Sequence, residues 1–154
     1  MKIIGLTGSI AAGKSTVSKW FNELGIATHD ADLVVHELLK PGGGAVSEVL
    51  AMFGPHFGSL ASGINRELLG NEVFAAPQKR NHLESILHPM VRAHRDIFVE
   101  YHGKIDAPAV VLDVPLLFET NSDKICDYVI VVYATDETTV IRAMSRPGMT
   151  YQKL

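Results

Sequence analysis

The sequence contains a single cysteine and shows little excess of either charge. Because Cys126 is the only cysteine among the 154 residues, an intrachain disulfide is excluded. This fits a reducing compartment, and we expect the chain to be cytoplasmic. The formal net charge of −3 gives no sign of the clustered lysine and arginine that a broad nucleic-acid-binding surface would need. We therefore expect no nucleic-acid partner.

Long hydrophobic runs and metal-binding motifs are also missing. No window approaches the run of about 18 apolar residues needed to cross a bilayer, so we expect no membrane association. The first eight residues lack the long apolar stretch and cleavage site of a signal peptide. None of the seven histidines shows H-E-x-x-H spacing or accompanies a cysteine pair, which argues against a structural transition-metal site. The remaining class is one soluble globular domain over 1–154.

Short apolar segments alternate with amphipathic ones along the chain. Strands are predicted over 2–7, 26–29, 109–114 and 128–133, and helices over 14–24, about 30–39, from about 77 onward, and over 136–145. Short helices are predicted between 45 and 80, interrupted by Gly54-Pro55 and by 58–63. Apolar strands separated by helices predict an α/β fold, with a parallel sheet covered on both faces.

Two helices carry apolar stripes that we expect to face the core. In the first, the stripe consists of Val17, Trp20, Phe21 and Leu24. In the long helix, it consists of Leu83, Ile86, Leu87, Met90, Ile97 and Phe98. Pro89 lies inside this helix, so a kink or break is predicted near His88.

Three polar residues stand where predicted strands end, namely Thr7, His29 and Asp113. In parallel sheets, ligands bind at the carboxyl ends of the strands. These three positions are therefore expected to line one edge of the sheet and to mark the ligand-binding side.

A phosphate-binding loop follows the first strand. Gly8, Gly13, Lys14 and Ser15 satisfy the spacing G-x-x-x-x-G-K-S, and the strand before it and the helix after it supply the expected context. Little side-chain bulk lets backbone N–H groups turn inward around a phosphate, and the helix N-terminus adds its dipole. Lys14 can reach the β- and γ-phosphates, and Ser15 can ligate Mg²⁺. The predicted ATP-binding residues here are Gly8, Ala11, Ala12, Gly13, Lys14, Ser15 and Thr16.

Asp113 ends an apolar strand and resembles a Walker B carboxylate that holds Mg²⁺ or its water shell. The alternative is a polar residue that only caps the next turn. The presence of the phosphate-binding loop favours the metal site.

The sequence favours a small-molecule kinase over a GTPase. The guanine-selecting element of GTPases is missing, since Asn121-Ser122-Asp123-Lys124 does not fit it. The chain length suits a small-molecule kinase, which needs a carboxylate near the acceptor hydroxyl. Asp30 and Asp32 follow the second strand and are the candidates. Either residue could instead cap the next helix, and the sequence does not divide the two roles.

Several motifs, in this order, resemble the dephospho-CoA kinase family over essentially the whole chain. They are Gly5–Ser9 leading into Gly13–Thr16, His29–Asp32, Ile64-Asn65-Arg66, Leu87-His88-Pro89, Asp113–Glu119, and Arg142 with Arg146–Thr150. The resemblance implies a three-layer P-loop fold with a helical substrate-binding insertion at about 32–101 and the start of a lid at about 142–154. It also implies transfer of the ATP γ-phosphate, with Mg²⁺, to the ribose 3′-hydroxyl of dephospho-CoA.

The resemblance further assigns roles to individual residues. Asp32 matches the presumed general base, so the expected catalytic residues are Lys14, Asp32 and Arg142. Arg146, with Arg142, matches the arginines at the base of the lid and is added to the ATP-binding set. The substrate-binding residues are expected to be Asp32, His36, His88, Leu116 and Phe118, and the metal ligands Ser15 and Asp113. A monomer or a small homo-oligomer is expected.

The chain departs from the family pattern in two places. Many members carry arginine where this chain has His36, and histidine would contact a substrate phosphate more weakly above its ordinary pKa of about 6.5. Family members also continue past Leu154 through the rest of the lid helix and a last strand, so a fragment or an incomplete sequence is expected. Two alternatives stay open: a related kinase for a nucleoside monophosphate or sugar acid, and a nucleotide-binding domain without turnover.

Overall fold

The computed structural model describes residues 1–145 and 150. The chain folds into two compact units, which are described separately below. The first unit comprises residues 1–30 and the chain from 98 onward, and the second comprises residues 31–97. The long helix α5 (Pro77–Lys104) contributes residues to both.

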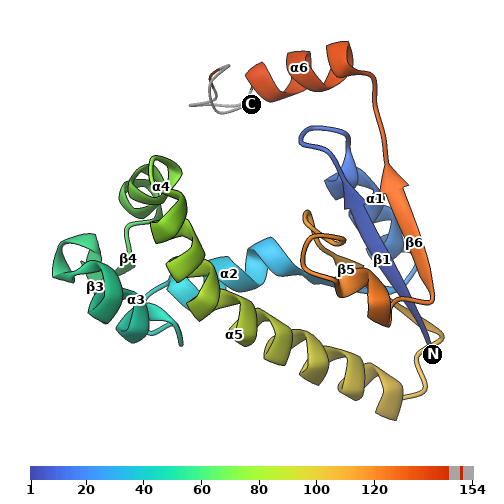
Figure 1. Cartoon of the computed structure of the whole chain (residues 1–154). Coiled ribbons are helices and arrows are strands. Elements are labelled where there is room, and N and C mark those ends of the chain that lie inside the picture. The colour runs from blue at the N-terminus through green and yellow to red at the C-terminus, as the bar shows by residue number, and fades with distance from the viewer. Residues whose placement is uncertain (146–149, 151–154) are drawn as a thin grey trace. The chain divides into compact units, whose positions relative to one another are not determined.

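A parallel sheet forms the centre of the first unit (Figure 1). Its strands are β1 (Lys2–Gly8), β2 (Ala27–Asp30), β5 (Ala109–Asp113) and β6 (Tyr128–Val132), in the order β2-β5-β1-β6. Val110, Val111 and Leu112 of β5 are fully buried, because β5 lies between two strands. The α/β prediction is confirmed, and each predicted strand lies within one or two residues of the observed one.

Helix α1 (Lys14–Glu23) packs against β1, β2 and β5 and ends before Gly25, whose φ of 76° is left-handed. The predicted core stripe of α1 is wrong in part. Val17 and Phe21 are half-buried, but Trp20 is 57% exposed and Leu24 75% exposed. The two pairs occupy neighbouring i, i+4 rows, and the row of Val17 and Phe21 is the more buried one.

Strand β6 is the edge of the described sheet, and its side chains are more exposed than the prediction of a buried strand implied. It is tied to β1 by Asp127, whose carboxylate accepts the Ile3 N–H at 2.8 Å and pairs with Lys2. The Ile3 hydrogen bond and then the Lys2 ammonium lower the pKa of Asp127. Helix α6 (Asp136–Met144) follows, capped by Thr135, and η2 (Ser122–Ile125) precedes the strand.

The second unit is mostly helical. It contains α2 (Ala31–Leu39), α3 (Val46–Phe53), η1 (Pro55–Phe57) and α4 (Arg66–Phe74). A two-stranded antiparallel hairpin of β3 (Gly58–Ser59) and β4 (Gly63–Ile64) interrupts them, where only breaks between helices were predicted. The strands approach closely, since a methyl group added at Gly58 would lie 2.0 Å from the Gly63 carbonyl oxygen.

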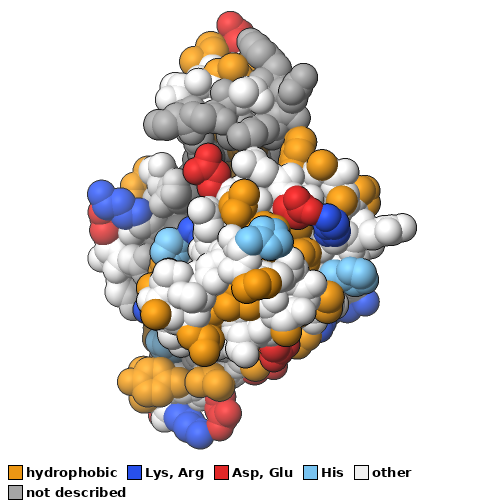
Figure 2. Space-filling view, turned by 90° about the vertical axis from the view of Figure 1, so that its left-hand side faces the viewer, with side chains coloured by type: hydrophobic (Ala, Val, Ile, Leu, Met, Phe, Trp, Pro, Cys, Tyr) orange, Lys and Arg blue, Asp and Glu red, His pale blue; other side chains and the backbone are white. Residues whose placement is uncertain are grey.

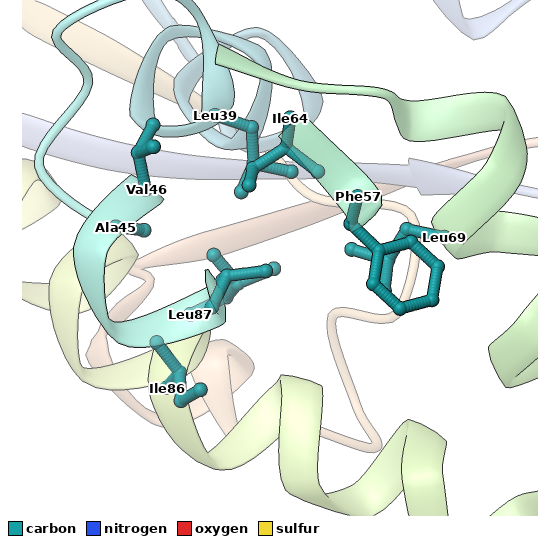
Figure 3. Close-up of a cluster of buried hydrophobic side chains, with 9 residues drawn as sticks. Leu39, Ala45, Val46, Phe57, Ile64, Leu69, Ile86 and Leu87 are labelled. Carbon is teal, nitrogen blue, oxygen red and sulfur yellow. The ribbon is translucent and has the colours of Figure 1, made fainter. Parts of the chain in front are cut away.

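One apolar cluster holds the second unit together (Figure 3). Its members come from α2, from α3 and its N-cap residue Ala45, and from η1, β4, α4 and α5, so it joins every helix of the unit. The buried side chains are Leu39, Ala45, Val46, Val49, Phe57, Ile64, Leu69, Ile86 and Leu87. This cluster fixes the positions of α2 and α4 relative to each other.

A kink or a break was predicted near His88, and α5 continues through Pro89 without a break. The carbonyl group that Pro89 leaves without its helical partner belongs to Ser85. Ser85 and Pro89 are both exposed, so water can bind this carbonyl. Of the predicted stripe, Ile86 and Leu87 are buried, but Ile97 is exposed and does not belong to the core.

The surface carries a mixture of side-chain types. On the face shown in Figure 2, charged side chains of both signs are interspersed with histidines and apolar groups among the described residues. Across the described part of the chain, no helix combines the length and apolar character needed to cross a membrane.

Candidate functional site

The loop between β1 and α1 has the backbone geometry of an anion cradle. Ala11 adopts φ of 59° and Gly13 φ of 110°, both left-handed, and the Ala12 N–H donates to the Ser9 carbonyl oxygen at 3.1 Å. Alternating backbone handedness turns successive N–H groups toward the same side, which makes a concave anion-binding nest. Alanine at position 11 keeps the loop free of bulk, although a side chain there is strained.

The start of α1 leaves its positive end available to a ligand. Gly13 is the N-cap and has no side chain with which to satisfy the first amides. The first turn, from Lys14 to Val17, carries no carboxylate. Since the first N–H groups of a helix have no intrahelical acceptors, an anion placed here would receive their hydrogen bonds.

Gly8 allows the loop to leave the sheet at this point. A methyl group added at Gly8 would lie 2.5 Å from the carbonyl oxygen of Val132, a backbone atom of the neighbouring strand β6. The glycine is therefore required by close packing of β1 against β6, in addition to its place in the motif.

Lys14 and Asp113 meet at the carboxyl end of the sheet. The Lys14 Nζ donates to the Asp113 carboxylate, with the two side chains 18% and 3% exposed. Strand β5 pairs directly with β1, and Asp113 is aligned with Leu6, which brings the strand end beside the loop. The lysine thus holds a buried carboxylate next to the phosphate cradle.

The residues expected to hold Mg²⁺ offer suitable donors. Asp113 presents carboxylate oxygens and Ser15, in the first turn of α1, a hydroxyl. Hard oxygen ligands of this kind suit Mg²⁺, which usually keeps several waters and takes its other ligands from substrate phosphates. The donor set therefore fits the ion.

Arg142 of α6 reaches the same loop. Its Nη1 lies 3.5 Å from the Ala12 carbonyl oxygen and donates to it, and it lies beside Gly13. A second cation thus flanks the cradle, from a helix far away in the sequence. Arg146, the other predicted lid arginine, lies outside the described residues.

The loop after β5 is held against β1 by a contact that the sequence did not indicate. The Thr7 hydroxyl donates to the Pro115 carbonyl oxygen at 2.9 Å, and Thr7 itself is buried. Leu117 is fully buried beneath Gly5, while its neighbours Leu116 and Phe118 are each 53% exposed. The two predicted substrate-binding residues of this loop are thus exposed apolar groups on an anchored segment.

The neighbouring strand end carries His29 and Asp30. His29 is buried, with its ring 5.4 Å from that of Phe98, and Asp30 is aligned with Asp113 of β5. Thr7, His29 and Asp113 do lie at the strand ends, as the sequence indicated.

The remaining predicted residues belong to the second unit. Asp32 and His36 are exposed on α2, and His88 is exposed on α5. The structure adds Arg66, whose Nη1 donates to the Nδ1 of His36. Sequence reasoning quoted Arg66 within a motif but gave it no role, because the pairing joins residues 30 positions apart.

Comparison with known proteins gives a consistent result. A family model described as dephospho-CoA kinase matches residues 2–154. A dephospho-CoA kinase of Rhodospirillum rubrum is 49% identical over 148 residues, which cover 96% of this chain and 70% of that protein.

Two solved structures are similar as well. A crystal structure of a Thermus thermophilus protein has a TM-score of 0.79 at 30% identity and covers 99% of this chain and 75% of that one. A dephospho-CoA kinase from Campylobacter jejuni has a TM-score of 0.69 at 29% identity, covering 97% and 75%.

Proposed function

The chain belongs to the dephospho-CoA kinase family, and we propose that it transfers the γ-phosphate of ATP to the ribose 3′-hydroxyl of dephospho-CoA. The products are coenzyme A and ADP, so the enzyme is a phosphotransferase with an alcohol acceptor. One observation of the structure carries the proposal beyond the family relationship: Lys14 of the phosphate-binding loop contacts the buried carboxylate of Asp113. We place the reaction in the cytoplasm, where ATP is available.

The first unit supplies the nucleotide site in this proposal. The amides of the loop and of the first turn of α1 bind the phosphate oxygens, and Lys14 neutralises the β- and γ-phosphates. Arg142 adds charge over the same loop as negative charge spreads on the transferring group. Ser15 and Asp113 would hold Mg²⁺, which would neutralise part of the negative charge of the phosphates.

Asp32, His36 and His88 of the second unit are among the residues proposed to act on the acceptor. The oxygen of the ribose 3′-hydroxyl bonds to the γ-phosphorus, and Asp32 accepts the proton of that hydroxyl. The bond between the γ-phosphorus and the β–γ bridging oxygen breaks. ADP leaves with the bridging oxygen. Because phosphoryl transfer depends mostly on in-line positioning and charge neutralisation, Asp32 contributes orientation as well as proton transfer. His36, His88, Leu116 and Phe118 are proposed to contact the acceptor.

An acceptor panel tests the reaction. ADP release from the full chain with Mg·ATP is measured with dephospho-CoA, AMP, gluconate or no acceptor. Stimulation by dephospho-CoA with formation of coenzyme A is expected. Stimulation by AMP or gluconate instead would assign the chain to another small-molecule kinase, and ATP binding without any turnover would leave a nucleotide-binding domain.

The role of Asp32 is tested by Asp32→Asn. We expect kcat to fall about 10²- to 10⁴-fold, the usual contribution of a general base, while the Kd of ATP stays within about twofold of the unsubstituted chain. The control is Asp106→Asn, since Asp106 is an exposed carboxylate in the first unit with a left-handed φ that asparagine also tolerates. Near-normal turnover of Asp32→Asn would contradict the role of Asp32 as a general base.

A further inference from the structure

The segment after β5 carries two apolar side chains that face solvent. Leu116 and Phe118, which are proposed to contact the acceptor, are each 53% exposed, while Leu117 between them is fully buried. An apolar contact binds a ligand best when its side chains are already held in place, because ordering a free side chain on binding weakens the affinity. The contacts that fix residues 114–122 therefore bear on acceptor binding.

The beginning of this segment is anchored to β1. The Val114 N–H donates to the Leu6 carbonyl oxygen at 3.0 Å. The Thr7 hydroxyl donates to the Pro115 carbonyl oxygen at 2.9 Å, and the proline ring restricts the backbone further by fixing φ. The two hydrogen bonds fix the backbone immediately before Leu116.

The middle of the segment is held by the side chain of Leu117, which packs against the bare backbone of Gly5. A methyl group added at Gly5 would lie 2.9 Å and 3.3 Å from the two terminal carbons of Leu117. The leucine thus fills the space that the glycine leaves. With Leu117 buried there, Leu116 and Phe118 are left on the exposed side.

The end of the segment is closed by a Schellman motif. Asn121 adopts a left-handed φ of 55°, which asparagine tolerates better than most residues. Its N–H donates to the Phe118 carbonyl oxygen at 3.0 Å, and the Ser122 N–H donates to the Leu117 carbonyl oxygen at 2.9 Å. These are the two backbone hydrogen bonds that end a helical turn in this motif. The carbonyl groups of residues 117 and 118 are therefore fixed by the backbone.

Thr120 holds the carbonyl group of Leu116 with two donors. Its N–H donates to that oxygen at 3.1 Å and its hydroxyl at 2.7 Å. Since a hydroxyl donates one hydrogen bond, the buried Ser122 hydroxyl, 3.0 Å away, donates to Thr120. Any residue at position 120 could supply the N–H, so the hydroxyl is what makes threonine specific here.

We propose that Thr120 is a positioning residue for the acceptor. Its hydroxyl fixes the Leu116 carbonyl and thereby holds the side chains of Leu116 and Phe118 in the orientation that binds dephospho-CoA. This inference rests on the proposed function, from which the contacts of these two side chains with the acceptor are taken. Because Thr120 acts through these side chains and not on the reacting atoms, its loss weakens acceptor binding and leaves the rate of phosphoryl transfer unchanged.

The test removes the hydroxyl and keeps the shape of the side chain. One neutral hydrogen bond corresponds to about a 2- to 12-fold change in an equilibrium constant. We expect the KM of dephospho-CoA to rise by this factor in Thr120→Val, with kcat and the KM of ATP unchanged. Thr120→Ser keeps the hydroxyl and should restore the KM. Thr120→Ala should match the valine variant and replaces it in the test if valine disturbs folding.

Thr139→Val is the matched control. Thr139 is a half-buried threonine of the same unit, and its hydroxyl donates to the Asp136 carbonyl oxygen at 2.8 Å. Valine there removes an equivalent hydrogen bond from a threonine with no proposed role in acceptor binding. The KM of dephospho-CoA in this variant should equal that of the unsubstituted chain.

A double-mutant cycle shows whether Thr120 acts through the apolar pair. In a chain with Leu116→Ala and Phe118→Ala, the side chains to be positioned are missing, so adding Thr120→Val should raise the KM of dephospho-CoA no further. If Thr120→Val instead raises the KM by the same factor in both backgrounds, Thr120 does not act through Leu116 and Phe118, and the positioning role is wrong.

The remaining outcomes separate the positioning role from the function on which it rests. An unchanged KM of dephospho-CoA in Thr120→Val, with normal phosphorylation, overturns the positioning role and leaves the function intact. A parallel rise in the KM of ATP, or a fall in kcat, would show a general structural role and overturn it as well. Failure of the unsubstituted chain to bind or phosphorylate dephospho-CoA overturns the proposed function and the positioning role with it.

Discussion

Thr7 links two segments that both end at the phosphate side of the sheet. Its backbone belongs to β1, directly before Gly8, and its hydroxyl donates to the Pro115 carbonyl oxygen in the loop after β5. That loop begins after Asp113, the partner of Lys14. The buried Thr7 hydroxyl therefore helps to hold the loop that follows Asp113 against the strand that leads into the phosphate-binding loop.

Replacing this hydroxyl tests its contribution. Thr7→Val keeps the shape of the side chain but leaves the Pro115 carbonyl without its donor, so we expect the free energy of unfolding to fall by about 1–2 kcal/mol. Thr7→Ser keeps the hydroxyl and should lose less. Urea denaturation followed by circular dichroism measures both. Equal stability of the valine and serine variants would contradict the assigned hydrogen bond.

The sequence predicts candidate site residues where the signal is local. The predicted phosphate-binding loop is contiguous, and its expected place between a strand and a helix is confirmed. The contact of Lys14 with Asp113 depends on β5 pairing beside β1, and strand order is not encoded in any local pattern. The contact of Arg66 with His36 depends likewise on packing between α2 and α4.

At the scale of elements, β1 and β6 approach so closely that one position admits only glycine. A side chain at Gly8 would meet the backbone carbonyl of Val132, which cannot move without disturbing the pairing of the two strands. Gly70 of α4 is the opposite case, because a methyl group there meets no atom within 4 Å among the described residues.

The two glycines should therefore respond in opposite directions to alanine. Gly8→Ala is expected to lower the free energy of unfolding by about 1–3 kcal/mol through overpacking, and to weaken ATP binding because the loop starts here. Gly70→Ala should raise the free energy of unfolding by up to about 1 kcal/mol, since alanine is more favourable than glycine in a helix interior. Urea denaturation and ATP titration measure the two effects. A tolerated Gly8→Ala would contradict the close approach.

Most elements could be located from sequence, and the exceptions have physical causes. Buried parallel strands such as β5 are continuously apolar, and Gly25 marks the end of α1, so these boundaries were predictable. The hairpin of β3 and β4 was missed because each strand has two residues and no alternating pattern. Of the kink or break predicted near Pro89, the break does not occur, because the freed carbonyl is on an exposed side of the helix, which sequence does not show.

At the scale of the whole molecule, the two units carry different groups that we propose to take part in the reaction. The first holds the phosphate-binding loop, Asp113 and Arg142, while the second holds Asp32 and His36 and has its own apolar cluster. A ligand that binds the native state of one unit stabilises it, by about 2.7 kcal/mol at a concentration one hundred times its Kd.

This division predicts which amides each substrate protects from hydrogen exchange. Mg·ATP alone should slow exchange in residues 8–17, by up to about a hundredfold where exchange requires opening of the bound unit. Dephospho-CoA alone should instead slow exchange around residues 32–40. Mass spectrometry of peptides from the two regions measures both effects in the same experiment.

Two variants separate the sites within this experiment. Lys14→Ala removes the cation of the loop, so it should reduce protection by Mg·ATP while leaving protection by dephospho-CoA in place. His36→Phe should do the reverse, because it changes a side chain proposed to contact the acceptor but leaves the loop unchanged. Protection by dephospho-CoA confined to the first unit would contradict the proposed contacts of the acceptor with Asp32 and His36, because a ligand bound at α2 should slow exchange of the amides in that helix.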